Sequence, residues 1–249
     1  THLGLNTAVV IASGNYEVVC FDFNSSNISQ LKNGDTVYSE PELQDYLDHN
    51  KERLFFTSNQ EDLKGIDLIY VCPDVPTNKF GTSDLKIVDR YLELASASVK
   101  ELGTIVLLSQ VPPGFTRQKI NENFTLVYQV ETLIFGRAIE RAREPERYII
   151  GMENETCSLP DKLQSLLRQN SDIPIFKMSY ESAELAKIAI NCCLVASVSV
   201  ANTLAELCEA IGANWMDIEK TLRADRRIGQ FSYLKTGLGL SGGNLERDL

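Results

Sequence analysis

The sequence predicts an α/β fold, with a doubly wound parallel sheet, followed by an all-helical region. Three observations support this. Apolar, β-rich runs alternate with helical segments through the first two-thirds of the chain, the strands cease near residue 178, and the remainder has helical periodicity. Alternation of strand and helix is typical of a parallel sheet covered by helices. We therefore predict an α/β domain over residues 1–178 and a helical domain over 179–249.

The expected elements follow from local composition. Strands are predicted where apolar and β-branched residues gather before a proline, a glycine or an acid, at 17–22, 54–56, 67–72, 104–109, 126–130, 148–151 and 173–178. Helices are predicted at 5–12, 25–31, 40–50, 85–101, 160–168, 181–211 and 215–222. An α/β domain normally begins with a strand, so we expect the first strand to lie upstream of Thr1.

Composition narrows the class of partner. The net charge of −10 argues against nucleic acid or an anionic membrane as the main partner. The six cysteines have no metal-ligand or redox-motif spacing, which favours a reducing, cytoplasmic setting, and two histidines predict no metal site. No signal peptide is visible. The longest apolar stretch, Ile188 to Ala201, is shorter than the roughly 20 residues of a membrane span, so it predicts a buried helix.

A dinucleotide site is indicated near the start of the chain. A phosphate-binding fingerprint needs glycines at i, i+2 and i+5 between a strand and a helix. If Gly4 is the third, Thr1 stands at the second. Asp22 ends the next strand 18 residues later, where an acid binds the adenosine ribose of NAD and repels the 2′-phosphate of NADP. The alternatives are a turn glycine and a solvated acid at a strand end.

A second candidate site lies on the long helix. Glu184, Lys187 and Asn191 are spaced by three and four residues, which puts them on one helical face. A partly desolvated lysine can take the proton of an alcohol as its hydride leaves, and an amide can hold the oxygen. The alternative is a solvated stripe on an amphipathic helix.

The motifs resemble those of one family. Residues 184–191, ELAKIAIN, resemble the E-L-x-K-x-x-x-N of the UDP-glucose/GDP-mannose dehydrogenase family. Further resemblances run in order: 40–43 to E-P-G-L, 75–77 to T-P-T, 109–114 to S-T-V-P-P-G, 129–136 to N-P-E-F-L-x-E-G, 225–229 to D-x-R-I-G, and 237–248 to G-x-G-[aromatic]-G-G-S-C-F-x-K-D. The resemblance implies a Rossmann-like NAD-binding domain followed by a 6-phosphogluconate-dehydrogenase-like helical domain. The family's third, UDP-binding domain would begin after Leu249 and is absent here.

The resemblance also implies roles for individual residues. The catalytic set is Lys187, Asn191, Asn244, Asp248 and Glu131, with Asn244 in place of the family's cysteine. The NAD-binding set is Leu3, Gly4, Asp22, Pro76, Thr77, Gln110 and Arg247. The substrate-binding set is Glu131, Leu133, Lys187, Asn191, Gly239 and Gly243. Gln110, Phe135 and Arg247 replace a threonine, a glutamate and a lysine of the family.

The departures bear on one half of the family's chemistry. The family oxidises C6 of a UDP- or GDP-sugar twice with NAD, the second time through a cysteine thioester, which an amide cannot form. Four hypotheses follow: a one-step alcohol dehydrogenase, an inactive binding homologue (supported by Thr1 and Phe135), four-electron oxidation through an aldehyde hydrate, and an engineered trap at Asn244. Family members pair their long helices between subunits, so we expect a homodimer through residues 181–211.

Overall fold

The computed structural model describes residues 1–36, 38–78, 82–169 and 172–237. The chain divides into two compact units, Thr1–Pro76 with Asp84–Leu185, and Thr77–Ser83 with Ala186–Leu249. Every strand of the described residues belongs to the first unit, and the last one ends at Ser179 where the long helix begins at Tyr180. The domain boundary near residue 178 stays a prediction.

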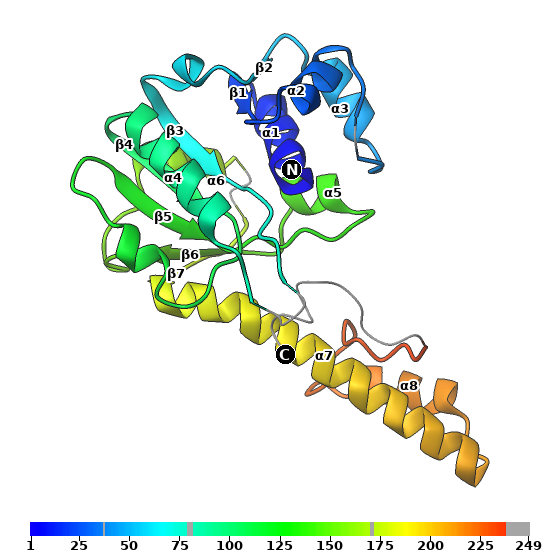
Figure 1. Cartoon of the computed structure of the whole chain (residues 1–249). Coiled ribbons are helices and arrows are strands. Elements are labelled where there is room, and N and C mark those ends of the chain that lie inside the picture. The colour runs from blue at the N-terminus through cyan, green and yellow to red at the C-terminus, as the bar shows by residue number, and fades with distance from the viewer. Residues whose placement is uncertain (37, 79–81, 170–171, 238–249) are drawn as a thin grey trace. The chain divides into compact units, whose positions relative to one another are not determined.

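The strands of the first unit form two parallel-rich sheets (Figure 1). The larger has the order β3 (Ile66–Val71), β4 (Val99–Leu107), β5 (Thr125–Gln129), β6 (Tyr148–Met152) and β7 (Ile175–Ser179). The smaller pairs β1 (Val18–Phe21) with β2 (Leu54–Thr57) in parallel. β6 runs antiparallel to β5, and all other pairs are parallel. The α/β fold class is confirmed, and the one antiparallel pair is a feature that strand–helix alternation did not predict.

Helices alternate with the strands along the chain and pack against them. They are α1 (His2–Ser13), α2 (Ser25–Lys32), α3 (Leu43–His49), α4 (Lys86–Ser98), α5 (Ala138–Arg143), α6 (Asp161–Leu167), α7 (Tyr180–Ile211) and α8 (Trp215–Ala224), with 3₁₀ turns η1 (Gln60–Leu63) and η2 (Thr116–Lys119). The sequence did not predict α5, η1 or η2, because six or fewer residues are too short to show a period. α3 begins three residues later than predicted because Pro41 disfavours helical backbone at Glu40, and Glu42 is left-handed with φ 65°.

The larger sheet is covered on both faces. Val106, Val127 and Ile150 pack with Leu163 and Leu167 of α6 on one face. Ile105 and Leu107 are fully buried and, by strand alternation, point to the opposite face. Figure 1 shows α4 lying across the sheet, and Val88, Leu92 and Ala95 are its buried apolar residues. A separate cluster places α1 against α3, β2 and α5 through Val9, Ala12, Leu43, Leu47, Leu54 and Ile139.

An apolar cavity of about 520 Å³ lies between β1 and β3. Residues 18–22 and 66–73 line it, together with parts of α1 and α4. Among the described residues β1 pairs only with β2, and β3 only with β4, so both strands present an edge that no neighbour covers. The expectation of a strand upstream of Thr1 stays a prediction.

The second unit is built on α7 and α8. Trp215, at the start of α8, packs with Ala201 and Cys208 of α7 and with Leu234, and its indole Nε1 donates to the Leu234 carbonyl oxygen over 3.2 Å. Figure 1 shows α8 alongside the later turns of α7. This small core holds the two helices together.

The prediction that residues 188–201 form a buried helix is wrong. α7 is helical throughout, but only 11% of its most apolar window is buried within the chain. By length and composition alone, this helix could also cross a membrane, a property that core helices share. Its exposure has a physical reason: the unit's small core occupies one face of the helix, and the described residues leave much of the rest uncovered.

Candidate functional site

The loops after β3 and β4 meet at one edge of the sheet. Since β3, β4 and β5 are parallel, their carboxyl ends share this edge, where open α/β sheets bind ligands. The Ser109 hydroxyl donates to the Pro73 carbonyl oxygen over 2.6 Å, and the Leu108 amide donates to the Val71 carbonyl oxygen over 2.9 Å. The two loops are therefore held together as one rim.

The amino end of α1 is fixed to this rim by a single hydroxyl. Thr1 is the N-cap, and its Oγ1 accepts from the Gly4 amide over 3.0 Å. The same hydroxyl donates to the Cys72 carbonyl oxygen, at the end of β3, over 2.7 Å. A helix amino end carries partial positive charge and amides without helical acceptors, so it suits an anion such as a pyrophosphate.

Gly4 fills the place that the fingerprint requires. A β-carbon at this position would lie 2.8 Å from Cys72 Sγ and 3.1 Å from Thr1 Oγ1. Only a glycine allows the first turn of α1 to approach the end of β3 so closely. The cradle fits the pyrophosphate of a dinucleotide, and Thr1, Gly4 and Asp22 line one cavity.

Asp22 directly follows β1, as predicted. Its Oδ1 accepts from the Asn24 amide over 2.8 Å and from the Tyr91 hydroxyl over 3.4 Å. Its Oδ2 accepts from the Asn27 side-chain amide over 3.4 Å. The carboxylate is half-buried. Tyr91, on α4, was not a predicted site residue.

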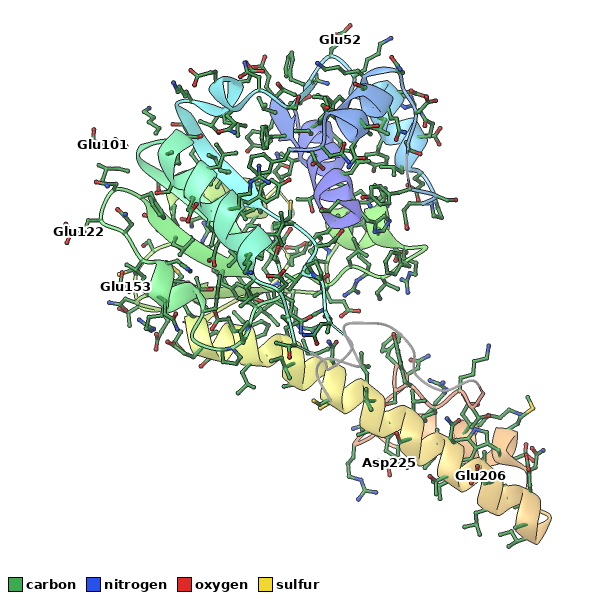
Figure 2. The ribbon with its side chains drawn as sticks, in the orientation of Figure 1. Glu52, Glu101, Glu122, Glu153, Glu206 and Asp225 are labelled. Carbon is green, nitrogen blue, oxygen red and sulfur yellow. The ribbon has the colours of Figure 1, made fainter. Side chains whose placement is uncertain are left out.

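Three glutamates lie at the other edge of the sheet. Glu101 lies near the amino end of β4 and Glu122 just before β5, and Glu153 follows the antiparallel β6. Figure 2 shows all three pointing outward from this end. The net negative charge thus does not argue against an anionic ligand at the carboxyl edge.

Glu40 anchors the loop that follows β5. Its side chain is 1% exposed and accepts from the Ala138 amide over 2.7 Å, the Gly136 amide over 3.1 Å and His2 Nε2 over 3.0 Å. Burial raises the pKa of Glu40, but these hydrogen bonds lower it more, so the net shift is downward. The imidazole of His2 also stacks on Phe135, with ring centroids 4.9 Å apart. Sequence reasoning quoted the motif at 40–43 but missed this role.

The remaining predicted residues of the first unit lie in loops. The Glu131 carboxylate accepts from the Leu133 amide over 2.8 Å, which brings these two together. Gln110 is buried and follows β4, and Leu3 lies in the first turn of α1. The Pro76 carbonyl oxygen accepts from the Asp84 backbone amide over 2.8 Å. Thr77 belongs to the second unit, where it bridges to Ser83.

The three candidate site residues of α7 have different surroundings. Glu184, in the first unit, is fully buried and accepts from the Gly114 amide over 2.5 Å and the Thr116 amide over 2.8 Å. It therefore ties α7 to the turn before η2 and has a structural role that sequence reasoning did not predict. Lys187 is half-buried and Asn191 is buried, both in the second unit.

Part of the predicted site lies beyond the described structure. Gly239, Gly243, Asn244, Arg247 and Asp248 lie outside the described residues. The residues of the first unit that are brought together are Gly4 with Cys72, Asp22 with Tyr91, and Glu131 with Leu133.

Two cysteines line the cavity between β1 and β3. Burial raises the pKa of Cys20 to about 12 and that of Cys72 to about 11. Both are therefore neutral thiols near pH 7, and a thiol is a poor nucleophile compared with its thiolate. Among the described residues, no group of three histidine, cysteine or acidic side chains could hold a metal ion.

A glycine-cradled helix start beside a parallel strand end, with an acid after the next strand, defines a dinucleotide-binding α/β domain. Sequence comparison agrees. The NAD-binding-domain model of the UDP-glucose/GDP-mannose dehydrogenase family matches residues 1–170, and the family's central-domain model matches residues 181–249. The chain therefore belongs to the UDP-glucose/GDP-mannose dehydrogenase family, and its cofactor is NAD.

Individual relatives give the same result. UDP-glucose 6-dehydrogenase TuaD of Bacillus subtilis is 30% identical over 99% of this chain and 55% of its own length. UDP-glucose 6-dehydrogenase of Rickettsia typhi is 28% identical over 100% of this chain and 59% of its own. The structure of a UDP-glucose dehydrogenase from Pyrobaculum islandicum superposes with a TM-score of 0.88 at 26% identity, covering 100% and 60% of the two chains. The chain thus spans somewhat more than half the length of these relatives.

Gly4→Ala is expected to weaken NAD binding about tenfold or more and to destabilise the protein by about 1–3 kcal/mol, as overpacking does. The added methyl would meet Cys72 Sγ at 2.8 Å. Calorimetric NAD titration and thermal unfolding measure the two effects. The matched variant is Gly4→Ala with Cys72→Ala, which removes the sulfur and should recover most of both losses. Unchanged affinity in the single variant would contradict the cradle.

Glu40→Gln is expected to lower the free energy of unfolding by about 1.5–3 kcal/mol at pH 7, the usual range for hydrogen bonds to a charged group. Because the native pKa of Glu40 is lowered, the unfolded chain protonates first. The stabilisation is therefore present at neutral pH and is lost as pH falls through and below about 4.3, the ordinary glutamate pKa. Urea unfolding of both proteins between pH 7 and 3 measures this.

Glu42→Gln serves as the control, since that carboxylate is 51% exposed and lies 3.9 Å from Arg143. It should change the unfolding free energy by less than about 0.5 kcal/mol. A pH-independent difference between Glu40→Gln and the unaltered protein would rule out the charged carboxylate as the anchor.

Proposed function

We propose that the chain is the cofactor-binding and central part of an NAD-dependent dehydrogenase that oxidises the C6 alcohol of a nucleotide sugar to an aldehyde and is impaired in the thioester step. The observation that carries this is the presence of Lys187 and Asn191 together with Asn244 where the family has its cysteine. The first oxidation needs a base, orientation and cofactor. The second needs a nucleophile that an amide cannot replace.

The first unit supplies most of the cofactor contacts in this proposal. The Leu3 amide, in the first turn of α1, faces the pyrophosphate, and Gly4, whose own amide donates to Thr1 Oγ1, lets the ligand approach closely. Asp22 accepts from the adenosine ribose. Pro76, Thr77, Gln110 and Arg247 complete the NAD-binding set. When bound, NAD supplies the acceptor for the two electrons that leave the alcohol carbon as hydride.

We assign Lys187 and Asn191 to deprotonating and orienting the substrate alcohol. The Lys187 amine takes the hydroxyl proton while the hydride leaves, so the products are an aldehyde, NADH and a proton. The Asn191 amide donates to the substrate oxygen and holds it for this transfer. Glu131 and Asp248 are assigned to water positioning, and Leu133, Gly239 and Gly243 to the sugar. A UDP- or GDP-sugar is the proposed substrate.

Neither thiol of the cavity beside the cofactor loops is suited to replace the missing cysteine. Cys20 and Cys72 line the adjoining cavity, but burial raises the pKa of both. A covalent acyl intermediate needs a thiolate close to pH 7. This supports arrest at the aldehyde. We also propose a cytoplasmic setting, which the spacing of the six cysteines favours.

Full-length protein with NAD and a panel of UDP- and GDP-sugars is expected to yield one NADH per sugar consumed, with an aldehyde product. Absorbance at the NADH band and product mass measure this. Lys187→Met should lower kcat about 10²–10⁴-fold, the usual contribution of a general base. Lys220→Met, which alters an exposed lysine of α8, is the control and should leave kcat unchanged.

Two results would change the assignment. Two NADH per sugar with a uronic acid product would indicate oxidation through an aldehyde hydrate. NAD binding without turnover of any sugar in the panel would favour the alternative, a catalytically inactive NAD- and nucleotide-sugar-binding homologue. In an active protein, Asn244→Cys also tests the thioester step. This substitution restores the nucleophile and should raise the yield of NADH per sugar.

We also propose that the chain forms a homodimer through residues 181–211. Val200, Leu204, Leu207 and Ile211 follow spacings of four, three and four, so they form one apolar stripe on α7, and they are 37–68% exposed. This seam lies on a different face from Ala201 and Cys208, which pack in the unit's own core. Burying the seam against its copy removes it from water.

Leu207→Glu is expected to convert a dimer into a monomer, because it places a charge in the middle of the apolar seam. Light scattering of the full-length protein over a concentration series measures the mass. Glu209→Lys, about half a turn away on the same helix, is the control and should leave the dimer intact. A monomer for the unaltered protein would refute the seam as an interface.

A further inference from the structure

An aromatic group surrounds the acid at the end of β1. Phe23 and Tyr91 have ring centroids 4.8 Å apart at 63°, and Phe21 lies 5.0 Å from Phe23 and 6.3 Å from Tyr91. The Arg90 guanidinium lies 3.6 Å above the Phe23 ring. These contacts hold α4 beside the end of β1 and fix where the Tyr91 hydroxyl lies.

The Asp22 carboxylate accepts only one hydrogen bond of ordinary length. The Asn24 amide is at an ordinary 2.8 Å, whereas the Tyr91 hydroxyl and the Asn27 amide are both at 3.4 Å. A hydroxyl bonded fully to a carboxylate lies at about 2.5–2.7 Å. The carboxylate, which can accept about four hydrogen bonds, therefore keeps acceptor capacity for a further hydroxyl beside these two neutral donors.

The same residues face the cavity that contains the helix start. Asp22, Asn27 and Tyr91 line it together with Thr1 and Gly4. A ligand with its pyrophosphate at the α1 amino end and its ribose at Asp22 would lie at the end of this cavity where β1 and β3 finish. Tyr91 is therefore within the adenosine end of the NAD site, although neither motif nor spacing indicated it.

We infer that Tyr91 is a specificity-determining residue for the adenosine ribose of NAD: its hydroxyl donates to the ribose 2′-oxygen while the 2′-hydroxyl donates to Asp22. The inference rests on the NAD-binding assignment of the domain. It deepens that assignment by naming the atom of the ligand that is recognised and the side chain that recognises it.

The chemistry of the three groups fits this arrangement. A ribose hydroxyl both donates and accepts, a carboxylate only accepts, and a phenol can donate. Burial and the neighbouring Asp22 raise the pKa of Tyr91 to about 12, so the phenol keeps its proton. A 2′-phosphate would accept from Tyr91 but would place its charge against the carboxylate of Asp22. The nearby cation, Arg90, is stacked on Phe23.

Calorimetric titration of the full-length protein with NAD, 2′-deoxy-NAD and NADP tests the inference. The unaltered protein should bind 2′-deoxy-NAD about tenfold or more weakly than NAD. Tyr91→Phe should bind NAD about three- to tenfold more weakly, in the range of one hydrogen bond, and should bind 2′-deoxy-NAD almost as the unaltered protein does. Tyr46→Phe removes a phenol that bonds Arg143 elsewhere in the unit and is the matched control.

The outcomes are separable. Equal losses for NAD and 2′-deoxy-NAD in Tyr91→Phe would show no coupling with the 2′-hydroxyl and would overturn the inference. NADP binding as tight as NAD would also overturn it and would assign recognition to Arg90. If the unaltered protein bound no NAD, the NAD assignment itself would fail. The comparison of ligands on the unaltered protein needs no variant, so it stands even if Tyr91→Phe folds poorly.

Discussion

The Thr1 hydroxyl makes the contact on which the cofactor site depends. It accepts from Gly4 at the start of α1 and donates to the Cys72 carbonyl at the end of β3. One hydroxyl thereby sets the helix start against the strand end, and the absence of a side chain at Gly4 lets them close to contact. The partial charge of the helix is consequently aimed at the carboxyl edge of the sheet. This contact sets the spacing between the helix start and the strand end.

Local pattern predicted most of the fold because strands and long helices carry their own periods. It did not predict the direction of β6, since antiparallel and parallel strands have the same composition when both faces are buried. It also mistook the apolar composition of α7 for burial within one chain. Composition indicates that a surface avoids water, but it does not say whether the same chain, a copy or another partner covers it.

The residues of the candidate site also differ in whether a local pattern could predict them. Gly4 and Asp22 could be predicted because their fingerprint is a matter of spacing along the chain. The contacts of Glu40, Tyr91 and Glu184 could not be predicted, because each acts through partners far away in sequence: 98 residues for Glu40 with Ala138, 69 for Tyr91 with Asp22, and 70 for Glu184 with Gly114. Only the folded chain brings these groups to hydrogen-bonding distance. All three support a loop or an acid that the motifs had already indicated.

The packing of Trp215 has a spectroscopic consequence. It is the single tryptophan of the chain, and it lies in the small core between α7 and α8. Intrinsic indole emission therefore reports on the helical unit and does not report on unfolding of the sheet. Far-ultraviolet dichroism follows both units together. Unfolding curves from the two signals coincide only if the chain loses its structure in one cooperative step, so their separation would resolve the units' individual stabilities.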